Sequence, residues 1–130
     1  GSSITGNAVT VLNAGSGNDI VFNASTNDFG SVSIVAGNNV TIVDTNALVL
    51  AASTVSGNAS ITANGAITTS GNLALNGLAS TIYAQTANAD LTISNAITNN
   101  NGAASTLDLR ADRNVTFATG GSATLSRSLT

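Results

Sequence analysis

The sequence predicts an all-β, three-sided parallel β-helix, or β-solenoid, with three short strands in each coil. Short apolar-x-apolar triplets recur along the chain and are bounded by Gly and Asn, an alternation typical of strands. Related pieces return after 20 residues, because GNDIVF at 17–22 becomes GNNVTI at 37–42. No apolar stripe with helical spacing extends beyond about one turn. The chain also has no proline, which would interrupt a ladder of paired strands.

The triplets define the expected strands in order along the chain. Most contain an apolar residue, one intervening residue and a second apolar residue, and they recur every 6 to 12 residues or so. In the first part of the chain the apolar positions are Val9/Val11, Ile20/Phe22, Val32/Ile34, Val40/Ile42 and Leu48/Leu50. Further along they are Ile61, Ile67, Leu73/Leu75, Ile82/Ala84, Leu91/Ile93, Leu107/Leu109, Val115/Phe117 and Ala123/Leu125.

Strands this short suit a stack of coils better than a sandwich. The triplets group in threes as 32–34, 40–42 and 48–50; 60–62, 66–68 and 73–75; 82–84, 91–93 and 96–98; and 107–109, 115–117 and 123–125. Each group spans about 20–25 residues, so we expect roughly five coils, stacked about 4.8 Å apart by parallel pairing. The stretch 96–106 is expected to contain a longer loop.

The alternation also assigns the side chains to the inside and outside of the coils. The outer apolar residues of each triplet should form the core, because successive side chains of a strand point to opposite faces. The middle residues should face solvent: Thr10, Ser33, Thr41, Thr92, Thr116 and Thr124. Asn residues recur at the turns, and we expect their side chains to form ladders between coils.

Composition excludes several classes of protein. Of the 130 residues 42% are hydrophobic and only 7% are charged, which is too apolar for a disordered linker. The net charge is −3 and the cations are Arg110, Arg113 and Arg127, so nucleic acid is not an expected partner. No apolar run approaches the roughly 20 residues of a membrane span, so membrane insertion is not expected. We expect one domain over 1–130, with Gly1-Ser2 left from cloning.

The stretch 37–75, GNNVTIVDTNALVLAASTVSGNASITANGAITTSGNLAL, resembles the repeats of filamentous-haemagglutinin-like exoproteins. Such proteins are secreted by two-partner systems or are large autotransporter adhesins. The resemblance covers most of 30–98 and, more loosely, the rest of the chain. It implies a right-handed β-helix and a fragment of a larger exported protein, extracellular or on the bacterial cell surface. It also implies a structural shaft segment of a virulence-associated adhesin, with neighbouring β-helix segments of the parent protein as partners.

Other functions stay open beside the shaft. The first is an adhesion module that binds a host glycan or protein through its loops. Polysaccharide lyases or hydrolases and ice-binding solenoids are further alternatives. Ice binding needs regular rows of threonine, and the row here is interrupted by Val21, Val49, Ala74, Tyr83 and Asp108. Because the chain has few charges and no lysine to protect strand edges, we also expect end-to-end self-association.

Residues 15–23, GSGNDIVFN, look like one copy of a calcium-binding nonapeptide, which makes Asp19 the metal candidate. Sites of this kind hold each ion between neighbouring turns with Asp and carbonyl oxygens, so they need several consecutive copies. The next copies have Asn39 and then Ala59 in place of the acid. The sequence therefore favours a turn at Gly17-Asn18 over a metal site.

The stretch 108–113, DLRADR, is the densest cluster of charges. Asp108 and Asp112 are a pair of acids close in sequence, as the two carboxylates of a glycosidase would be, and Arg110 or Arg113 would be the base of a lyase. Surface ion pairs are the preferred interpretation. We therefore expect no enzyme, no catalytic residue and no cofactor. These four residues and Tyr83 are the candidates for contact with a ligand.

Overall fold

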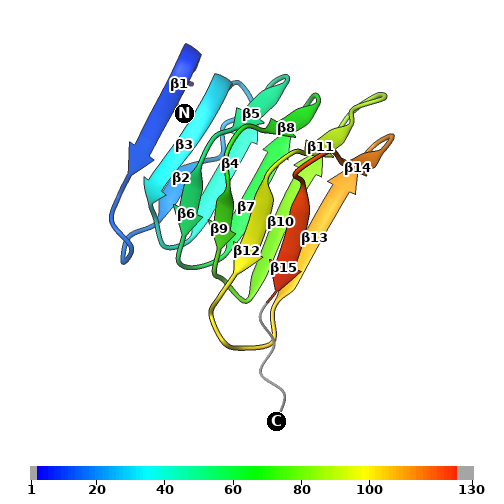
Figure 1. Cartoon of the computed structure of the whole chain (residues 1–130). Helices are drawn as coiled ribbons and strands as arrows, with labels where there is room; N and C mark the ends of the chain where they lie inside the picture. Colours follow the sequence, from blue (N-terminus) through cyan, green and yellow to red (C-terminus); the bar gives the residue numbers. More distant parts are fainter. Residues whose placement is uncertain (1–2, 126–130) are drawn as a thin grey trace.

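The computed structural model describes residues 3–125, so the predicted cloning remnant Gly1-Ser2 lies outside the described residues. Within this range fifteen strands form three sheets, every pairing is parallel, and there is no helix. The chain winds from sheet to sheet and returns beside itself, as Figure 1 shows. This confirms the predicted parallel β-solenoid.

The three sheets are named here by their numbers of strands. The six-stranded sheet contains, in order, β1 (Thr5–Asn13), β3 (Asp28–Ala36), β5 (Leu48–Leu50), β8 (Ile67–Thr69), β11 (Leu91–Ile93) and β14 (Val115–Phe117). The five-stranded sheet contains β2 (Ile20–Phe22), β4 (Val40–Asp44), β7 (Ala59–Ala63), β10 (Ala79–Ala84) and β13 (Thr106–Ala111). The four-stranded sheet contains β6 (Ser53–Val55), β9 (Leu73–Leu75), β12 (Ala96–Asn99) and β15 (Ser122–Leu125).

From β4 onward each coil visits the five-stranded, the six-stranded and then the four-stranded sheet. The pairing of Leu48 with Ile67 advances the chain by 19 residues. The pairing of Ala79 with Thr106 advances it by 27, because the loop at 100–105 extends the fifth coil. The longer loop predicted within 96–106 is therefore present, after the short strand β12. The six strands of the six-stranded sheet come from six successive coils, one more than the roughly five predicted.

The predicted grouping of strands into coils is right from residue 60 onward and wrong before it. Val32 pairs with Leu50, so 32–34 and 48–50 lie in one sheet on consecutive coils and not in a single coil. The coil that contains β4 and β5 has β6 as its third strand. This strand is not among the predicted triplets because its first inward residue is the polar Ser53. Ser53 is buried, and its hydroxyl is satisfied there because it accepts from the N–H of Ile34 (3.0 Å) and donates to the carbonyl of Ala51 (2.9 Å).

In β1 the predicted inward and outward faces are exchanged. Thr10 and Leu12 pair with buried residues of β3, whereas Val9 and Val11 are 53% and 62% exposed. The register shifts between Gly6 and Val9, where the strand has a bulge or irregularity. Because side chains alternate along a strand, an assignment that is out of phase by one residue puts every side chain on the wrong face. The prediction that Val9 and Val11 face the core and Thr10 faces solvent is therefore wrong.

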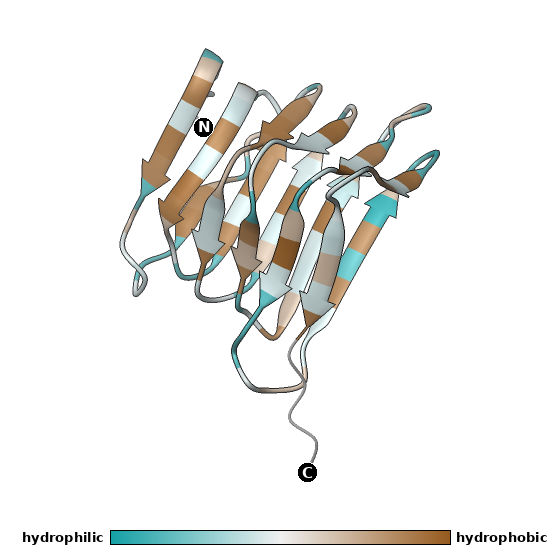
Figure 2. Cartoon of the chain, viewed as in Figure 1, coloured by the Kyte–Doolittle hydropathy of each residue, from teal (hydrophilic) through white to brown (hydrophobic). Residues whose placement is uncertain are grey.

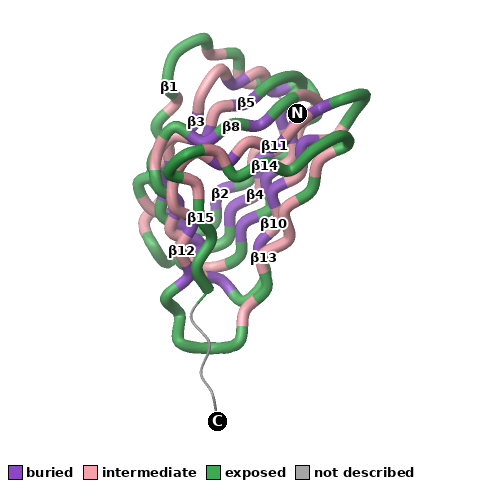
Figure 3. Tube along the Cα trace, turned by 45° about the vertical axis from the view of Figure 1, so that its right-hand side comes forward, coloured by how far each residue is buried: buried purple, intermediate pink, exposed green. Residues whose placement is uncertain are grey.

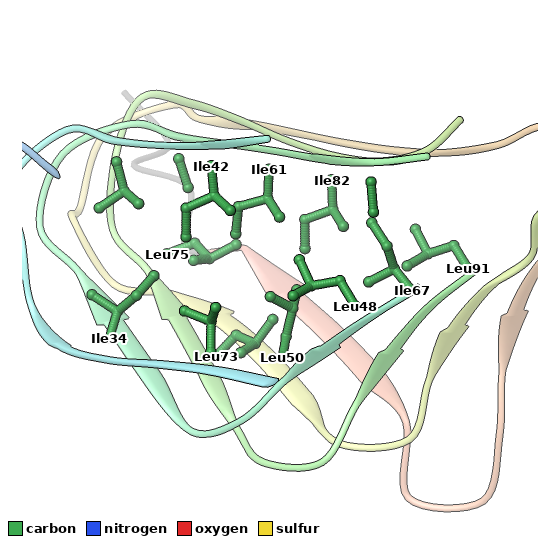
Figure 4. Close-up of a cluster of buried hydrophobic side chains, with 14 of the residues drawn as sticks. Ile34, Ile42, Leu48, Leu50, Ile61, Ile67, Leu73, Leu75, Ile82 and Leu91 are labelled. Carbon is green, nitrogen blue, oxygen red and sulfur yellow. The ribbon is translucent and has the colours of Figure 1, made fainter. Parts of the chain in front are cut away.

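In the other coils the inward residues stack in apolar columns. Ile42, Ile61 and Ile82 are successive neighbours in register along the five-stranded sheet, and Figure 4 shows them side by side. Ile67 and Leu91 form the same kind of stack in the six-stranded sheet. All five are at most 1% exposed. The strands alternate between apolar and polar bands in Figure 2, so each coil buries one apolar face against the next.

The apolar core continues to both ends of the described solenoid. At the last coil Val115, Phe117 and Leu125 are 41%, 48% and 36% exposed, although they pair with buried residues of the coil before. Figure 3 shows β14 and β15 as largely exposed. At the first end the six-stranded sheet begins with β1, whereas the five-stranded sheet begins one coil later with β2. The two ends therefore differ in outline.

Candidate functional site

Three of the predicted ligand-contact residues lie on the outer face of the five-stranded sheet. Tyr83 on β10 pairs in register with Arg110 on β13, and Thr81 pairs with Asp108 two residues earlier. The Arg110 guanidinium donates to Asp108 Oδ2 from Nε (2.7 Å) and lies within 2.6 Å of it through Nη2. This hydrogen bond raises the pKa of Arg110. The exposed pair adds little to stability, but it orients the Arg110 guanidinium on the strand next to Tyr83.

Asp112 and Arg113 follow β13 and bind a different part of the chain. Asp112 Oδ2 accepts from the N–H of Asn88 at 2.7 Å, in the loop before β11. Arg113 makes a two-point ion pair with Asp90, which also accepts from the N–H of Asn114 at 3.2 Å. The Arg113 hydrogen bond lowers the pKa of Asp90. The predicted charge cluster is thus divided between a sheet face and a corner of the coil.

This division does not favour carbohydrate hydrolysis or elimination. Asp108 and Asp112 are each bound to a different partner, and Asp112 lies beyond the end of β13. A base must be deprotonated to act. Hydrogen bonds to Asp108 and Asp90 instead raise the pKa of Arg110 and of Arg113. Of the surface ion pairs expected for DLRADR, Arg110–Asp108 forms within the stretch, whereas Arg113 pairs with Asp90 outside it. The absence of catalysis stays a prediction.

Asp19 lies in the turn between β1 and β2, and N–H donors crowd one of its oxygens. Oδ1 accepts from Asn38 Nδ2 (3.0 Å), the N–H of Asn39 (3.0 Å) and Asn39 Nδ2 (3.2 Å). The N–H of Asn39 is the main cause of a lowered pKa for Asp19. Calcium needs six to eight oxygen ligands, and residues 3–125 contain no group of three acids, histidines or cysteines placed to hold a metal. The geometry supports a turn at Gly17-Asn18.

Asp19 is also the first member of a ladder between coils. Asn39 Oδ1 accepts from the N–H of Asn58, and Asn58 Oδ1 accepts from the N–H of Ala79, both at 3.0 Å. Each of these three residues directly precedes a strand of the five-stranded sheet, and its side-chain oxygen accepts from a backbone N–H of the next coil. The predicted asparagine ladder is therefore present here, and of the Gly-Asn pairs at 17–18, 37–38 and 57–58 only the last places its Asn in it. The next residue of the row is Ala79, whose methyl side chain has no acceptor and ends the ladder.

The buried carboxyl of Asp44 is a polar feature that was not predicted. Asp44 is fully buried, and its two oxygens accept from the N–H of Phe29 (2.6 Å) and the N–H of Asn46 (3.0 Å). Burial raises the pKa of Asp44, although both hydrogen bonds act in the opposite direction. The sequence carried the signal, because residue 44 continues the inward alternation of Val40 and Ile42. Asp44 joins β3 to the turn of the following coil.

The outward threonines form narrow rows. On the six-stranded sheet Thr68, Thr92 and Thr116 are successive neighbours, and Val49 precedes them. The strands that carry them are three residues long, so each presents one outward side chain. A single interrupted row of this kind is not the regular array that an ice surface requires.

A hollow of about 250 Å³ lies beside the first strand of the five-stranded sheet. The end of β1, the following turn and β2 line it: Leu12, Asn13, Ala14, Asp19, Ile20, Val21 and Phe22. β2 pairs with β4 on one side and is the edge strand of its sheet on the other. Ile20 donates its N–H to the carbonyl of Asn39 in the β4 direction (2.9 Å). The N–H of Val21 therefore points to the unpaired edge, since successive N–H groups of a strand alternate sides.

Comparison with known proteins adds one result. Residues 37–107, more than half of the chain, match the profile of a family described as repeats of unknown function (DUF5649). The curated proteins and the solved structures include no match. Residues 3–125 also contain no helix that is long and apolar enough to cross a membrane.

Proposed function

The chain belongs to the family of repeats of unknown function (DUF5649), and from this we propose that it is a shaft segment of a larger adhesin or exoprotein. On this proposal the parent protein is exported from a bacterium, and the segment lies at the cell surface or outside the cell. The resemblance of 37–75 to filamentous-haemagglutinin-like repeats supports the adhesin part. The parallel β-solenoid supports the shaft part, because stacked coils make a quasi-one-dimensional rod.

The observation that carries the shaft proposal is the core that stays open at the last coil. Stacked repeats bury their apolar faces against neighbouring repeats. Here the outer face of the last coil presents Val115, Phe117 and Leu125. These residues pair with Leu91, Ile93 and Asn99 of the coil below, and they would be buried in the same way by a coil above. Neighbouring β-helix segments of the parent protein are therefore the proposed partners.

The same stacking gives the shaft its proposed mechanical role. Between coils the chain combines three ladders of parallel backbone pairing, apolar columns and the asparagine ladder. Each of these contacts lies along the axis of the stack. To separate two coils, all of them must be lost together at one level, so a segment of this kind resists extension and bending cooperatively.

Insertion of one extra coil tests the shaft proposal. Residues 40–58 form one complete period, from the first residue of β4 to the ladder residue before β7. A second copy of 40–58 placed after Asn58 should lengthen the particle by about 4.8 Å in X-ray scattering. It should also raise the melting temperature, because it adds one coil interface. The matched control carries the same residues in scrambled order. A particle that unfolds or fails to lengthen with the true copy would contradict the proposal.

The second candidate is a direct adhesion module, and the row of Tyr83, Arg110 and Asp108 favours it. An aromatic ring beside an oriented guanidinium and a carboxylate provides both a stacking surface and polar partners for a sugar. The test is a glycan array with the folded chain and with Tyr83→Ala. A module of this kind should bind specific glycans and lose them in the variant, whereas a shaft segment should stay silent.

Localisation and self-association are tested separately. Antibodies raised against the folded chain should label intact cells that make the parent protein, and external protease should remove the label. Labelling that appears only after the cells are opened would contradict the surface location. End-to-end association stays a prediction, and sedimentation over a range of concentrations tests it.

A further inference from the structure

We propose that the hollow beside β2 is a strand-acceptor site for an extended segment of the form Asn-apolar-x-apolar, paired in parallel with β2. The inference rests on the proposed shaft function, since it identifies the kind of segment that continues the stack. Addition of a strand to a sheet edge is a known mode of peptide recognition, with affinity from the backbone and selectivity from alternate side chains.

The outline of the hollow is that of one missing strand. β1 extends the six-stranded sheet one coil beyond β2, so the free edge of β2 is recessed beside the end of β1. Leu12 and Ala14 line one side of the recess and pack against the core. Ile20 and Phe22 lie on β2 itself, and the Phe22 ring meets the Phe29 ring edge-on at 5.8 Å between centroids. The site therefore offers an apolar floor along an unpaired strand edge.

The opposite side of β2 shows which segment the site would take. There Ile20 pairs with Val40 and Phe22 pairs with Ile42, while Val21 and Thr41 face outward. A segment on the free edge would repeat this arrangement, with its two apolar residues over Ile20 and Phe22. The N–H of Val21 would donate to its backbone.

The asparagine of the incoming segment follows from the ladder. Asn39 offers Oδ1 to the N–H of Asn58, and Asp19 offers Oδ1 to the N–H of Asn39, each at 3.0 Å. An asparagine just before the incoming triplet would offer Oδ1 to the N–H of Asp19 in the same way. An aspartate there would place a second carboxylate next to Asp19, and like charges at close range are unfavourable. The site should therefore prefer Asn to Asp.

A second copy of the chain fits this site less well than a peptide does. The edge strand at its other end is β13, which carries the apolar-x-apolar triplet Leu107-Asp108-Leu109. However, β14 and β15 belong to the same last coil as β13. To bring β13 into the recess, β14 would have to occupy the level that β1 already fills. An extended peptide has no such neighbours.

The binding test uses a fluorescent peptide GNNVTIV, the sequence of residues 37–43, and anisotropy with the whole folded chain. We expect saturable 1:1 binding. The control peptide GNNTVTI places threonine over Ile20 and Phe22, and GDDVTIV replaces the asparagines by aspartate. Each should bind at least about tenfold more weakly, because it loses apolar burial or adds like charge.

Two variants of one residue test the site on the protein. Val21→Pro removes the N–H that points to the free edge and leaves the Ile20 N–H on the β4 side, whereas Val21→Thr keeps both. Circular dichroism first confirms that both variants fold. The affinity of Val21→Pro should fall by about tenfold, and that of Val21→Thr should change by less than about twofold.

Each alternative outcome overturns the proposal. Absence of saturable binding, or equal binding to Val21→Pro and the wild type, would show that the β2 edge is not an acceptor. Dimers that Val21→Pro abolishes, without peptide binding, would assign the site to a second copy. The coil insertion after Asn58 does not involve this edge, so its success with failure here would leave the shaft function intact. Peptide binding at β2 together with failure of the coil insertion would support the acceptor site and contradict the shaft function.

Discussion

Gly77→Ala should destabilise the solenoid, because there is no room for a Cβ between two stacked coils at this turn. A Cβ on Gly77 would lie 2.3 Å from the carbonyl oxygen of Gly57 and 2.5 Å from Asn58 Oδ1. Ordinary van der Waals contact of a Cβ begins at 3.4 Å. The nearest atom is backbone of the neighbouring coil and cannot rotate away. The two coils must therefore move apart locally by roughly 1 Å.

The cost follows from the bonds that cross this gap. The N–H of Asn76 donates to the carbonyl of Val55 at 2.9 Å, and the N–H of Ala79 donates to Asn58 Oδ1 at 3.0 Å. Overpacking costs about 1–3 kcal/mol, and one lost hydrogen bond costs about 1 kcal/mol. We expect a total of about 2–4 kcal/mol for Gly77→Ala. For a chain of this size this lowers the melting temperature by about 10 °C.

Thermal melts followed by circular dichroism, with urea denaturation at 25 °C, measure the effect. Gly17→Ala is the matched control, because a Cβ on Gly17 has no atom within 4 Å and the backbone has no positive φ there. It should leave stability unchanged within about 1 kcal/mol or raise it slightly. The reasoning is refuted if Gly77→Ala melts within about 2 °C of the wild type, or if Gly17→Ala loses as much.

Three further predictions concern the core, the ion pair at the corner and the turn. Ile61→Ala should cost about 2–5 kcal/mol in urea denaturation, whereas Val43→Ala on the outer face should cost less than about 1 kcal/mol; equal losses would contradict the assigned faces. Arg113→Gln should reduce the loss of stability on acidification from about pH 4 to pH 2. The Arg113 pair lowers the folded-state pKa of Asp90, so its contribution is complete above the unfolded-state pKa and is lost as pH falls through the folded-state pKa. Melts at a series of pH values measure this, and parallel curves for variant and wild type would count against it. Finally, the melting temperature should be the same in millimolar calcium and in chelator, because N–H donors occupy Oδ1 of Asp19; a rise of more than about 3 °C in calcium would restore the metal site.

The ion pairs show why the candidate site was only partly predictable. In sequence, the nearest acid to Arg113 is its neighbour Asp112, and DLRADR reads as one local cluster. In the structure Arg113 instead binds Asp90, 23 residues earlier, because the coil brings that corner directly beneath it. Asp112 meanwhile accepts from the N–H of Asn88. Which charges meet depends on the length of each coil, and the loops set that length.

Asp44 and the hollow beside β2 illustrate two further kinds of feature. Asp44 could have been predicted, since the alternation that places Val40 and Ile42 inside also places residue 44 inside. The hollow could not, because it depends on how far two different sheets extend along the axis. That difference follows from the path of β1 through the first coil, which no local pattern records.

The sequence by itself determined most of the strands, the coil period of about 20–25 residues and the inward faces of most coils. Each of these depends on alternation within a strand or on repetition between strands, and both are local properties of the chain. The tertiary structure decided the rest: the exchanged faces of β1, the polar strand β6 and the partners of the charged residues. In each case the outcome depends on which residue of the neighbouring coil lies alongside. In β1 the pairing of Thr10 and Leu12 with the buried Val32 and Ile34 sets the inward face, and because the side-chain period of a strand is two residues, a wrong phase misplaces every side chain.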